Sequence, residues 1–277
     1  MPILPRKSPP YWPLQPSSSS TAEQTAPDFL IRMDDDSFLR VLDDPNLQQV
    51  LDQKVDPIMV EASHEIEREG DVERAISLYL LHTVNQILAR YLVRKRLIQD
   101  DSQFFCFTRS KEHSSVVDVL WKVKSVDVLA LELKNWGAIR IDTDWDPAIL
   151  PISSPEDALE AAIEQKIADG VQLGENATVL LKQLVKYHSA YDTPYVLACD
   201  WGNMMCLDME PNGLPWNDDD VDENSFPEVL YTAGSAAGSD ALTFHKMVIA
   251  AFLQAVKRLD GKIKSAMPGP FLPHVGV

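Results

Sequence analysis

The sequence predicts a mixed α/β fold in which helices cover both faces of a central sheet. Segments with helical and strand patterns follow the order α-β-β-β-α-α-β-β-α along the chain, and strands enclosed between helices in this way favour a layered α/β architecture. The 277 residues are 45% hydrophobic and 24% charged, which is typical of a globular chain that buries a sizeable core.

A long amphipathic helix opens the series. Its apolar residues, from Val72 to Leu92, recur at steps of three and four, the spacing at which a helix returns to the same face. Gly70 and Asp71 mark its expected start. Three cations at 94–96 mark its expected end, because the helix dipole favours positive charge there.

Strand patterns follow this helix. A short strand is expected at 104–108, and longer strands at 116–123 and 126–134, which are rich in Val and Leu as strands with a covered face usually are. Only two residues separate the longer pair, so we predict a hairpin. The polar segment 136–154, which contains Trp and Pro, is expected to form a loop.

The second half of the chain continues with two helices and a second hairpin. The helices are expected at 154–170, where Ser154 precedes a proline at the first helical position, and at 175–191. Two apolar segments, 195–199 and 204–209, flank the sequence Asp-Trp-Gly-Asn, which indicates a tight turn between paired strands.

We expect a single domain between a leader and a tail. The leader, 1–27, holds seven prolines and a serine run and is expected to be disordered. Residues 28–57 are expected to form two short helices, the first capped by Asp36 or Ser37. Within the domain, 28–265, we also expect a core at about 71–210, an acidic loop at 211–228 and a final helix at 240–260 that is capped by Asp240. A tail follows at 266–277.

Charge and cysteine content narrow the possible function classes. The 42 Asp and Glu residues against 25 Lys and Arg give a net charge of −17, which argues against a protein that coats nucleic acid or an anionic membrane with its whole surface. Three scattered cysteines do not support a disulfide framework, so we expect a reduced, intracellular protein of the cytoplasm or nucleus. No run of 18 apolar residues is present, and we expect no membrane partner.

Three charged residues interrupt the predicted hairpin. Asp118 lies in its first strand, and Glu132 and Lys134 end its second strand on one face, because strand side chains alternate. An unpaired charge in an apolar strand is costly, and Mg²⁺ or Mn²⁺ joining the two carboxylates would explain the set. Lys134 would then orient or deprotonate the attacking water. The alternative is that the three charges face solvent at strand ends.

These residues form part of a larger motif. Val117-Asp118 and Leu131-Glu132-Leu133-Lys134, on a hairpin with helices before and after it, resemble the PD-(D/E)XK nuclease superfamily, with Val117 in place of the motif's proline. Gln183 and Tyr187, four residues apart on one helix face, are similar to the Q-x-x-x-Y element of its RecB-like branch.

The resemblance implies a restriction-endonuclease-like core with extra N- and C-terminal helices and a metal-dependent hydrolysis of phosphodiester bonds in DNA or RNA. The catalytic residues it implies are Asp118, Glu132, Lys134, Gln183 and Tyr187. The implied ligands of Mg²⁺ or Mn²⁺ are Asp118, Glu132, the carbonyl of Leu133 and a helix-borne glutamate, for which we choose Glu73 over Glu65, Glu67 and Glu69. The alternative for Glu73 is a solvated glutamate that the helix dipole favours.

A local basic segment bears on possible partners. Residues 90–140 hold ten Lys and Arg against six Asp and Glu, a net charge of +4 in an acidic chain. We expect this patch to bind nucleic-acid phosphates; the alternative is a cluster that pairs with acidic loops of its own chain. The acidic loop or the proline-rich leader would be the contact for a protein partner.

Two functions therefore compete. The first is a metal-dependent nuclease, which the intact Asp, Glu and Lys set favours. The second is a catalytically inactive PD-(D/E)XK-like module that binds or regulates protein partners. The net charge of −17 favours the second, because long-range repulsion opposes the approach of a polyanion.

Overall fold

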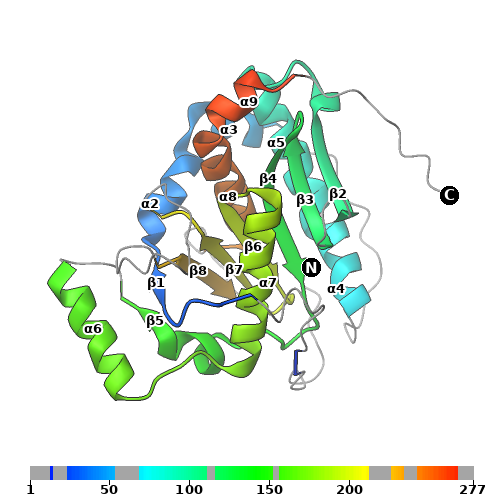
Figure 1. Ribbon diagram of the computed structural model, residues 1–277. Helices are drawn as coiled ribbons and strands as arrows, with labels where there is room; N and C mark the ends of the chain where they lie inside the picture. The colour runs from blue at the N-terminus through cyan, green and yellow to red at the C-terminus, as the bar shows by residue number, and fades with distance from the viewer. Residues whose placement is uncertain are drawn as a thin grey trace.

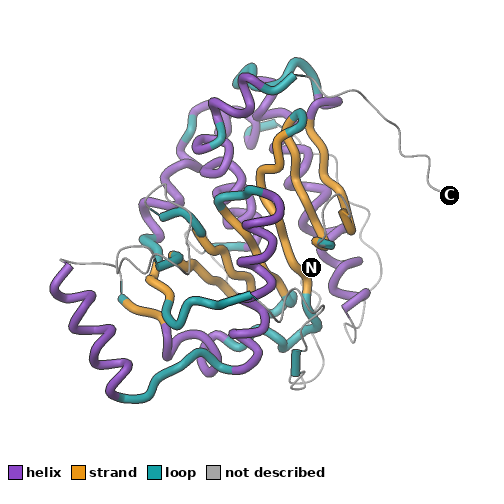
Figure 2. The backbone as a smooth tube through the Cα atoms, viewed as in Figure 1, coloured by secondary structure: helices purple, strands orange, loops and turns teal. Residues whose placement is uncertain are grey.

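A mixed sheet of eight strands forms the centre of the described structure (Figure 1, Figure 2). The computed structural model describes residues 13–14, 24–53, 69–110, 116–151, 156–211, 226–233 and 242–267. Within these residues the strands lie in the order β2-β3-β4-β6-β7-β8-β1-β5. In chain order they are β1 (Leu30–Arg32), β2 (Phe104–Ser110), β3 (Val117–Val123), β4 (Val126–Leu133), β5 (Ile149–Leu150), β6 (Tyr195–Cys199), β7 (Asn203–Asp208) and β8 (Glu228–Ala233).

Both predicted hairpins are present in this sheet. β3 pairs antiparallel with β2 on one side and β4 on the other, and β6 pairs antiparallel with β7. β4 and β6 run parallel, with Glu132 beside Ala198, and β1 runs parallel to both β8 and β5. The strand end that carries Glu132 therefore lies inside the sheet, with a neighbouring strand on each side.

Helices cover the two faces of the sheet, which confirms the predicted α/β architecture (Figure 1). One face is covered by α2 (Asp35–Leu39), α3 (Pro45–Leu51), α4 (Glu69–Ile76), α5 (His82–Arg94) and α8 (Phe244–Arg258), which α9 (Asp260–Ser265) follows. The other face is covered by α7 (Glu175–Tyr191). Helix α6 (Glu156–Ala168) lies beside β5. A π-helical turn, Ser77–Leu81, joins α4 to α5, so the predicted long helix is continuous but begins before Gly70 and Asp71. None of the described helices is long and apolar enough to cross a lipid bilayer.

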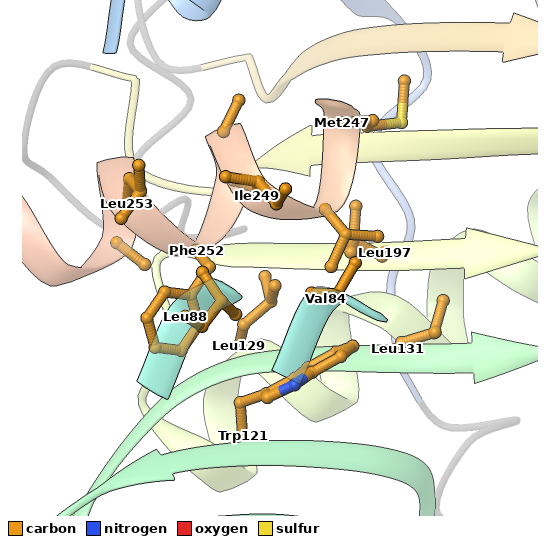
Figure 3. Packing of buried hydrophobic residues seen from close by; sticks show 14 of the residues in the cluster. Val84, Leu88, Trp121, Leu129, Leu131, Leu197, Met247, Ile249, Phe252 and Leu253 are labelled. Carbon is orange, nitrogen blue, oxygen red and sulfur yellow. The ribbon is translucent and has the colours of Figure 1, made fainter. Parts of the chain in front are cut away.

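An apolar layer packs between the sheet and helices α5 and α8. Figure 3 shows this layer, which includes Val84, Leu88, Trp121, Leu129, Leu131, Leu197 and Phe252. Along β4, Leu131 and Leu133 point into it, whereas Ala130 points into the layer under α7. Because burying each leucine stabilises the fold by about 2 kcal/mol, a strand turned over to face these leucines away from the layer would be strongly destabilised. Glu132 therefore faces α7.

Two helix caps differ from the predicted ones. The side chain of Asp34 caps α2, where it accepts a backbone N–H from Ser37, and Asp36 lies inside the first turn. Thr243 caps α8 with its hydroxyl, so the predicted cap, Asp240, is wrong. Both differences have one physical reason: a capping side chain must directly precede the first turn to reach its N–H groups.

Two short strands fall where the sequence predicts helix or loop, and a third lies in a segment for which no element was predicted. β1 lies in the 28–57 segment, and β5 lies in the 136–154 segment, which also holds the π-helical turn Ile141–Trp145. β8 begins at the end of the predicted acidic loop. β1 and β5 span three residues and two residues, too few for an alternating pattern to be recognised.

Part of the predicted organisation lies outside the described residues. These parts are residues 1–12 and 15–23 of the leader, the Ser154 cap, residues 212–225 of the acidic loop, Asp240 and residues 268–277 of the tail. Within the leader, Leu14 packs against the layer under α7 and its backbone N–H donates to Asn176 Oδ1 at 2.8 Å. At this point the leader contacts the domain.

Candidate functional site

The ends of β3 and β4 bring Asp118 and Glu132 together. The ladder between these strands pairs Val119 with Leu131. Asp118 and Glu132, the next residue on each strand, therefore lie opposite one another. Beyond the last ladder pair, the Leu133 N–H donates to Asp118 Oδ2 at 2.8 Å. The Asp118 carboxylate thus takes the place of a backbone acceptor where the ladder ends.

Lys134 lies two residues beyond Glu132, on the same side of the chain. Its backbone N–H donates to the Cys199 carbonyl at 2.9 Å, which anchors it to β6. Its ammonium forms a hydrogen-bonded ion pair with Glu132 Oε1. Only 6% of Glu132 and 8% of Lys134 is exposed. Because desolvation offsets most of the attraction in a buried pair, stability alone does not explain why two charges lie here.

Helix α7 adds two polar side chains above the strands. Its leucines Leu180 and Leu184 pack into the apolar layer, which holds the helix against the sheet. The Tyr187 hydroxyl donates to the Glu132 carboxylate. Gln183, one turn earlier on the same helix face, is 2% exposed, and its Oε1 has no hydrogen-bond partner in the described part of the chain. A buried acceptor without a donor costs about 1–3 kcal/mol.

The electrostatics of this cluster centre on Glu132. Burial raises the pKa of Glu132 to about 7; the Lys134 ammonium and the Tyr187 hydroxyl oppose the rise, and the charge of Asp118 adds to it. Burial, followed by the charge of Glu132, raises the pKa of Tyr187, so its hydroxyl stays protonated and acts as a donor. This environment therefore holds the Glu132 carboxyl group close to its protonation midpoint at neutral pH.

The side chains of the cluster suit a divalent cation. Two carboxylates and one ammonium leave a net negative charge when all three are ionised, and Asp118 Oδ1 accepts no hydrogen bond from the described residues. Carboxylate and carbonyl oxygens are the ligands that Mg²⁺ and Mn²⁺ prefer. The residues that would hold the ion are Asp118, Glu132 and, through its carbonyl, Leu133.

Glu73 is not brought to this cluster. It lies on α4, whose apolar residues Val72 and Ile76 pack on the opposite face of the sheet from α7. Among the described residues, no three His, Cys, Asp or Glu side chains gather as a metal-binding group. A metal at this site would therefore take its protein ligands from the strand ends and complete its shell with water or phosphate oxygens.

Asp200 is a buried residue that the sequence analysis did not assign to the site. Its Oδ2 accepts the N–H groups of Gly137 and Ile139 at 2.9 and 2.8 Å, and its Oδ1 accepts those of Gly202 and Asn203 at 2.9 and 2.7 Å. Burial raises its pKa to about 6, against the effect of these four donors. The carboxylate thus fixes the segment that follows Lys134 to the β6–β7 turn. An Asp directly before a Trp-Gly turn is the sequence signal that indicates such a role.

The described cations of the 90–140 segment do not all lie at one end of the sheet. Lys124, in the β3–β4 turn, donates to a backbone carbonyl of α9 at 2.9 Å, whereas Lys134 ends β4, roughly 30 Å away along the strand. Some of the cations pair with acids of the same chain: Lys95 with Asp44 at 2.9 Å, Lys122 with Asp127 at 3.0 Å, and Lys134 with Glu132. The predicted basic patch is therefore not one surface around the candidate site.

Three cavities of the described structure lie away from the candidate site. One of about 1010 Å³ lies between α5, α3 and β2, one of about 750 Å³ lies between α3 and α8, and a polar one of about 310 Å³ surrounds the Arg258–Asp208 ion pair. Their linings do not include the five candidate residues. Four of the five candidate residues are buried, namely Glu132, Lys134, Gln183 and Tyr187, and Asp118 is the most accessible member of the cluster.

Comparison with known proteins adds no relative. No protein-family model, curated protein or solved structure matches the chain. The resemblance to PD-(D/E)XK nucleases therefore depends on the motif residues alone, and their catalytic role stays a prediction.

Proposed function

We propose that this chain is a metal-dependent nuclease that hydrolyses phosphodiester bonds of DNA or RNA. One observation carries the proposal: Asp118, Glu132 and Lys134 converge at the ends of two paired strands, beside Tyr187 of α7. Paired carboxylates that share an edge with an ammonium group are suited to phosphoryl chemistry at a metal ion.

Each residue would have a distinct role. Asp118, Glu132 and the Leu133 carbonyl would hold Mg²⁺ or Mn²⁺, which when bound would supply Lewis acidity and lower the pKa of a water ligand. Lys134 would donate a hydrogen bond to a phosphate oxygen as negative charge grows there. Tyr187 would keep the Glu132 carboxylate oriented, because its hydroxyl remains a donor.

A second function, a binding module without catalysis, is favoured by the burial of the cluster. Glu132 and Lys134 pair with one another and are almost fully buried, and the three cavities described above lie away from them. A net charge of −17 also opposes a polyanionic substrate. In this case the polar cluster would be structural, and protein partners would contact other surfaces.

Cleavage assays with matched variants separate the two functions. The purified protein is incubated with labelled single-stranded DNA, duplex DNA and RNA, with Mg²⁺, Mn²⁺ or EDTA. Glu132→Gln removes the charge but keeps an oxygen acceptor for Lys134, whereas alanine would leave a buried ammonium unpaired at a cost of about 3–5 kcal/mol. Asp127→Asn is the control, because Asp127 is also an ion-paired acid on β4 but lies near the opposite end of the strand.

The proposal expects cleavage that requires metal, that falls at least about 100-fold in Glu132→Gln, and that persists in Asp127→Asn. Equal cleavage by the parent and Glu132→Gln would assign the activity to another site or to a contaminant. No cleavage of any of the three substrates with either metal would overturn the nuclease and leave the binding module.

A further inference from the structure

Asp200 lies directly beyond the end of β6, beside the end of β4 that carries Lys134. The two strands run parallel, and their last ladder pair joins Leu133 to Cys199, so Asp200 follows at the level of Lys134. The Lys134 N–H donates to the Cys199 carbonyl at 2.9 Å, which keeps the two strand ends together. Because neighbouring strands are about 4.8 Å apart, the Lys134 side chain is long enough to reach either of two carboxylates, Glu132 and Asp200.

Backbone donors fill the acceptor positions of the Asp200 carboxylate, which is 0% exposed. The four donors, at 2.7–2.9 Å, are the N–H groups of Gly137 and Ile139 at Oδ2 and those of Gly202 and Asn203 at Oδ1. An ionised carboxylate has about four acceptor positions, so these N–H groups saturate it. The Lys134 ammonium is thus left to Glu132, with which it forms its ion pair.

These donors come from two turns, one after each strand. Gly137 lies in the turn 135–138 and has a φ of 86°, which a glycine adopts without strain. The turn 200–203 connects β6 to β7. Asn203 adds a second link between the turns, because its Nδ2 donates to the Ile139 carbonyl at 2.8 Å. The chain that leaves β4 is therefore held against the end of β6.

We propose that Asp200 is a positioning residue for Lys134: by accepting four N–H groups it joins the two turns and keeps the Lys134 ammonium on Glu132. This role rests on the proposed nuclease function, in which Lys134 donates to a phosphate oxygen. Asp200 acts through backbone N–H groups rather than on the reacting atoms. Because a displacement of about 1 Å in a catalytic group can lower a rate about 100-fold, an ammonium drawn away from Glu132 would slow the reaction.

Amine labelling of the metal-free, full-length protein tests this role without a cleavage assay. Asp200→Asn keeps the size of the side chain but replaces one oxygen with an amide group, which cannot accept two of the N–H groups. A limiting amount of acetic anhydride acetylates accessible amines, and mass spectrometry gives the rate at each lysine. We expect Lys134 to react at least about fivefold faster in Asp200→Asn than in the parent, because the loss of two hydrogen bonds lets the strand end open locally.

Lys122 and Asp208 supply matched controls. Lys122 pairs with Asp127 at 3.0 Å, and 13% of its side chain is exposed against 11% for Lys134. Its labelling rate should be the same in Asp200→Asn as in the parent. Asp208→Asn changes another buried carboxylate, at the far end of β7, and should leave the labelling rate of Lys134 unchanged.

A second variant tests the role if Asp200→Asn does not fold. Asn203→Ala keeps the N–H that donates to Asp200 but loses the bond to the Ile139 carbonyl, so it should also speed the labelling of Lys134. An unchanged Lys134 rate in the folded variants would overturn the proposal. Equal acceleration at Lys134 and Lys122 would overturn it too, because the substitution would then loosen the whole fold rather than release one side chain.

Cleavage kinetics connect this role with the proposed function. Asp200→Asn should lower kcat about 10–100-fold with a smaller change in KM. In a Lys134→Met background it should have no further effect, because Asp200 acts through Lys134. Independent, additive losses in the double variant would contradict the positioning role. A parent that cleaves none of the substrates would refute the nuclease, whereas the labelling rates alone decide whether Asp200 positions Lys134.

Discussion

Glu132 is a carboxylate held where water scarcely reaches, and its neighbours decide whether it carries a charge. Burial favours the protonated form, Lys134 and Tyr187 favour the ionised form, and Asp118 opposes ionisation. Because burial dominates, the pKa of about 7 leaves the carboxyl group divided between both forms at neutral pH. A cation bound between Asp118 and Glu132 would favour the ionised form, which is how the charge of this residue bears on the proposed function.

The metal-free protein should lose stability as Glu132 ionises. In the unfolded chain Glu132 titrates near 4.5, and in the folded chain near 7, so the folded state binds this proton more tightly. The free energy of unfolding of the parent should therefore fall, relative to that of Glu132→Gln, by roughly 2–3 kcal/mol between pH 4.5 and 7.5. Urea denaturation of both proteins in EDTA across this range measures the difference. Parallel pH profiles would show that Glu132 has an ordinary pKa.

At the scale of residues, local periodicity predicted the grouping of the cluster but not all of its contacts. Glu132 and Lys134 share a face because strands repeat every two residues, and Gln183 and Tyr187 share one because helices repeat near four. Asp200 was not predicted, because two of its four donors lie more than 60 residues away in the chain. A contact between residues so far apart in the chain cannot be predicted from a short stretch of sequence.

At the scale of elements, the hairpins and the long helices could be predicted, and the short parallel strands could not. β3 and β4 are seven and eight residues long, so their composition and their two-residue connection identify them. β1 depends on pairing with β8 and β5, which follow it by more than a hundred residues. Tertiary pairing, rather than local propensity, makes that segment a strand.

The Asp44 side chain connects α3 with α5, so its substitution should destabilise the packing of both helices. It caps α3 by accepting the Asn46 N–H at 2.8 Å, and it accepts the Tyr91 hydroxyl at 3.1 Å and pairs with Lys95 at 2.9 Å, both on or just beyond α5. Burial alone would raise its pKa, but the hydrogen bonds from Lys95, Asn46 and Tyr91 outweigh it and lower the pKa to about 2. Asp44→Asn should cost about 1–2 kcal/mol at pH 7.

The pH dependence of this loss gives an internal check. A carboxyl group with a lowered pKa stabilises the fold above its ordinary value of 3.8 and loses that effect as the pH falls toward 2. The difference in the free energy of unfolding between the parent and Asp44→Asn, measured by chemical denaturation, should therefore decrease below pH 4. Asp43→Asn, an exposed neighbour, is the matched control, and an equal loss in both variants would contradict the assigned contacts.

At the scale of the whole molecule, opposite charges are gathered into pairs within a strongly acidic chain. Arg258 holds the buried Asp208 with an Nη1–Oδ1 distance of 2.6 Å and stacks 4.6 Å above the Tyr195 ring. Lys122 and Asp127 form another partly buried pair. The +4 charge of residues 90–140 predicted a basic surface, but a sum over sequence does not contain the folding that pairs these cations and separates them along the sheet.

The net charge makes a final prediction about salt. Repulsion within a chain of charge −17 opposes the folded state, and the Debye length falls from about 30 Å at 0.01 M salt to about 8 Å at 0.15 M. Buried pairs such as Arg258–Asp208 are screened little, and exposed pairs contribute at most about 1 kcal/mol each. The free energy of unfolding at pH 7 should therefore rise with NaCl, on the order of 1 kcal/mol over that range.

Chemical denaturation at a series of NaCl concentrations measures this rise. Near pH 4.7, where the sequence carries no net charge, the rise should almost vanish, because there is no net repulsion left to screen. Stability that instead falls with NaCl at pH 7 would mean that attractive pairs at the surface outweigh the repulsion of the whole chain. The comparison of the two pH values decides between these cases, since only the repulsion follows the net charge.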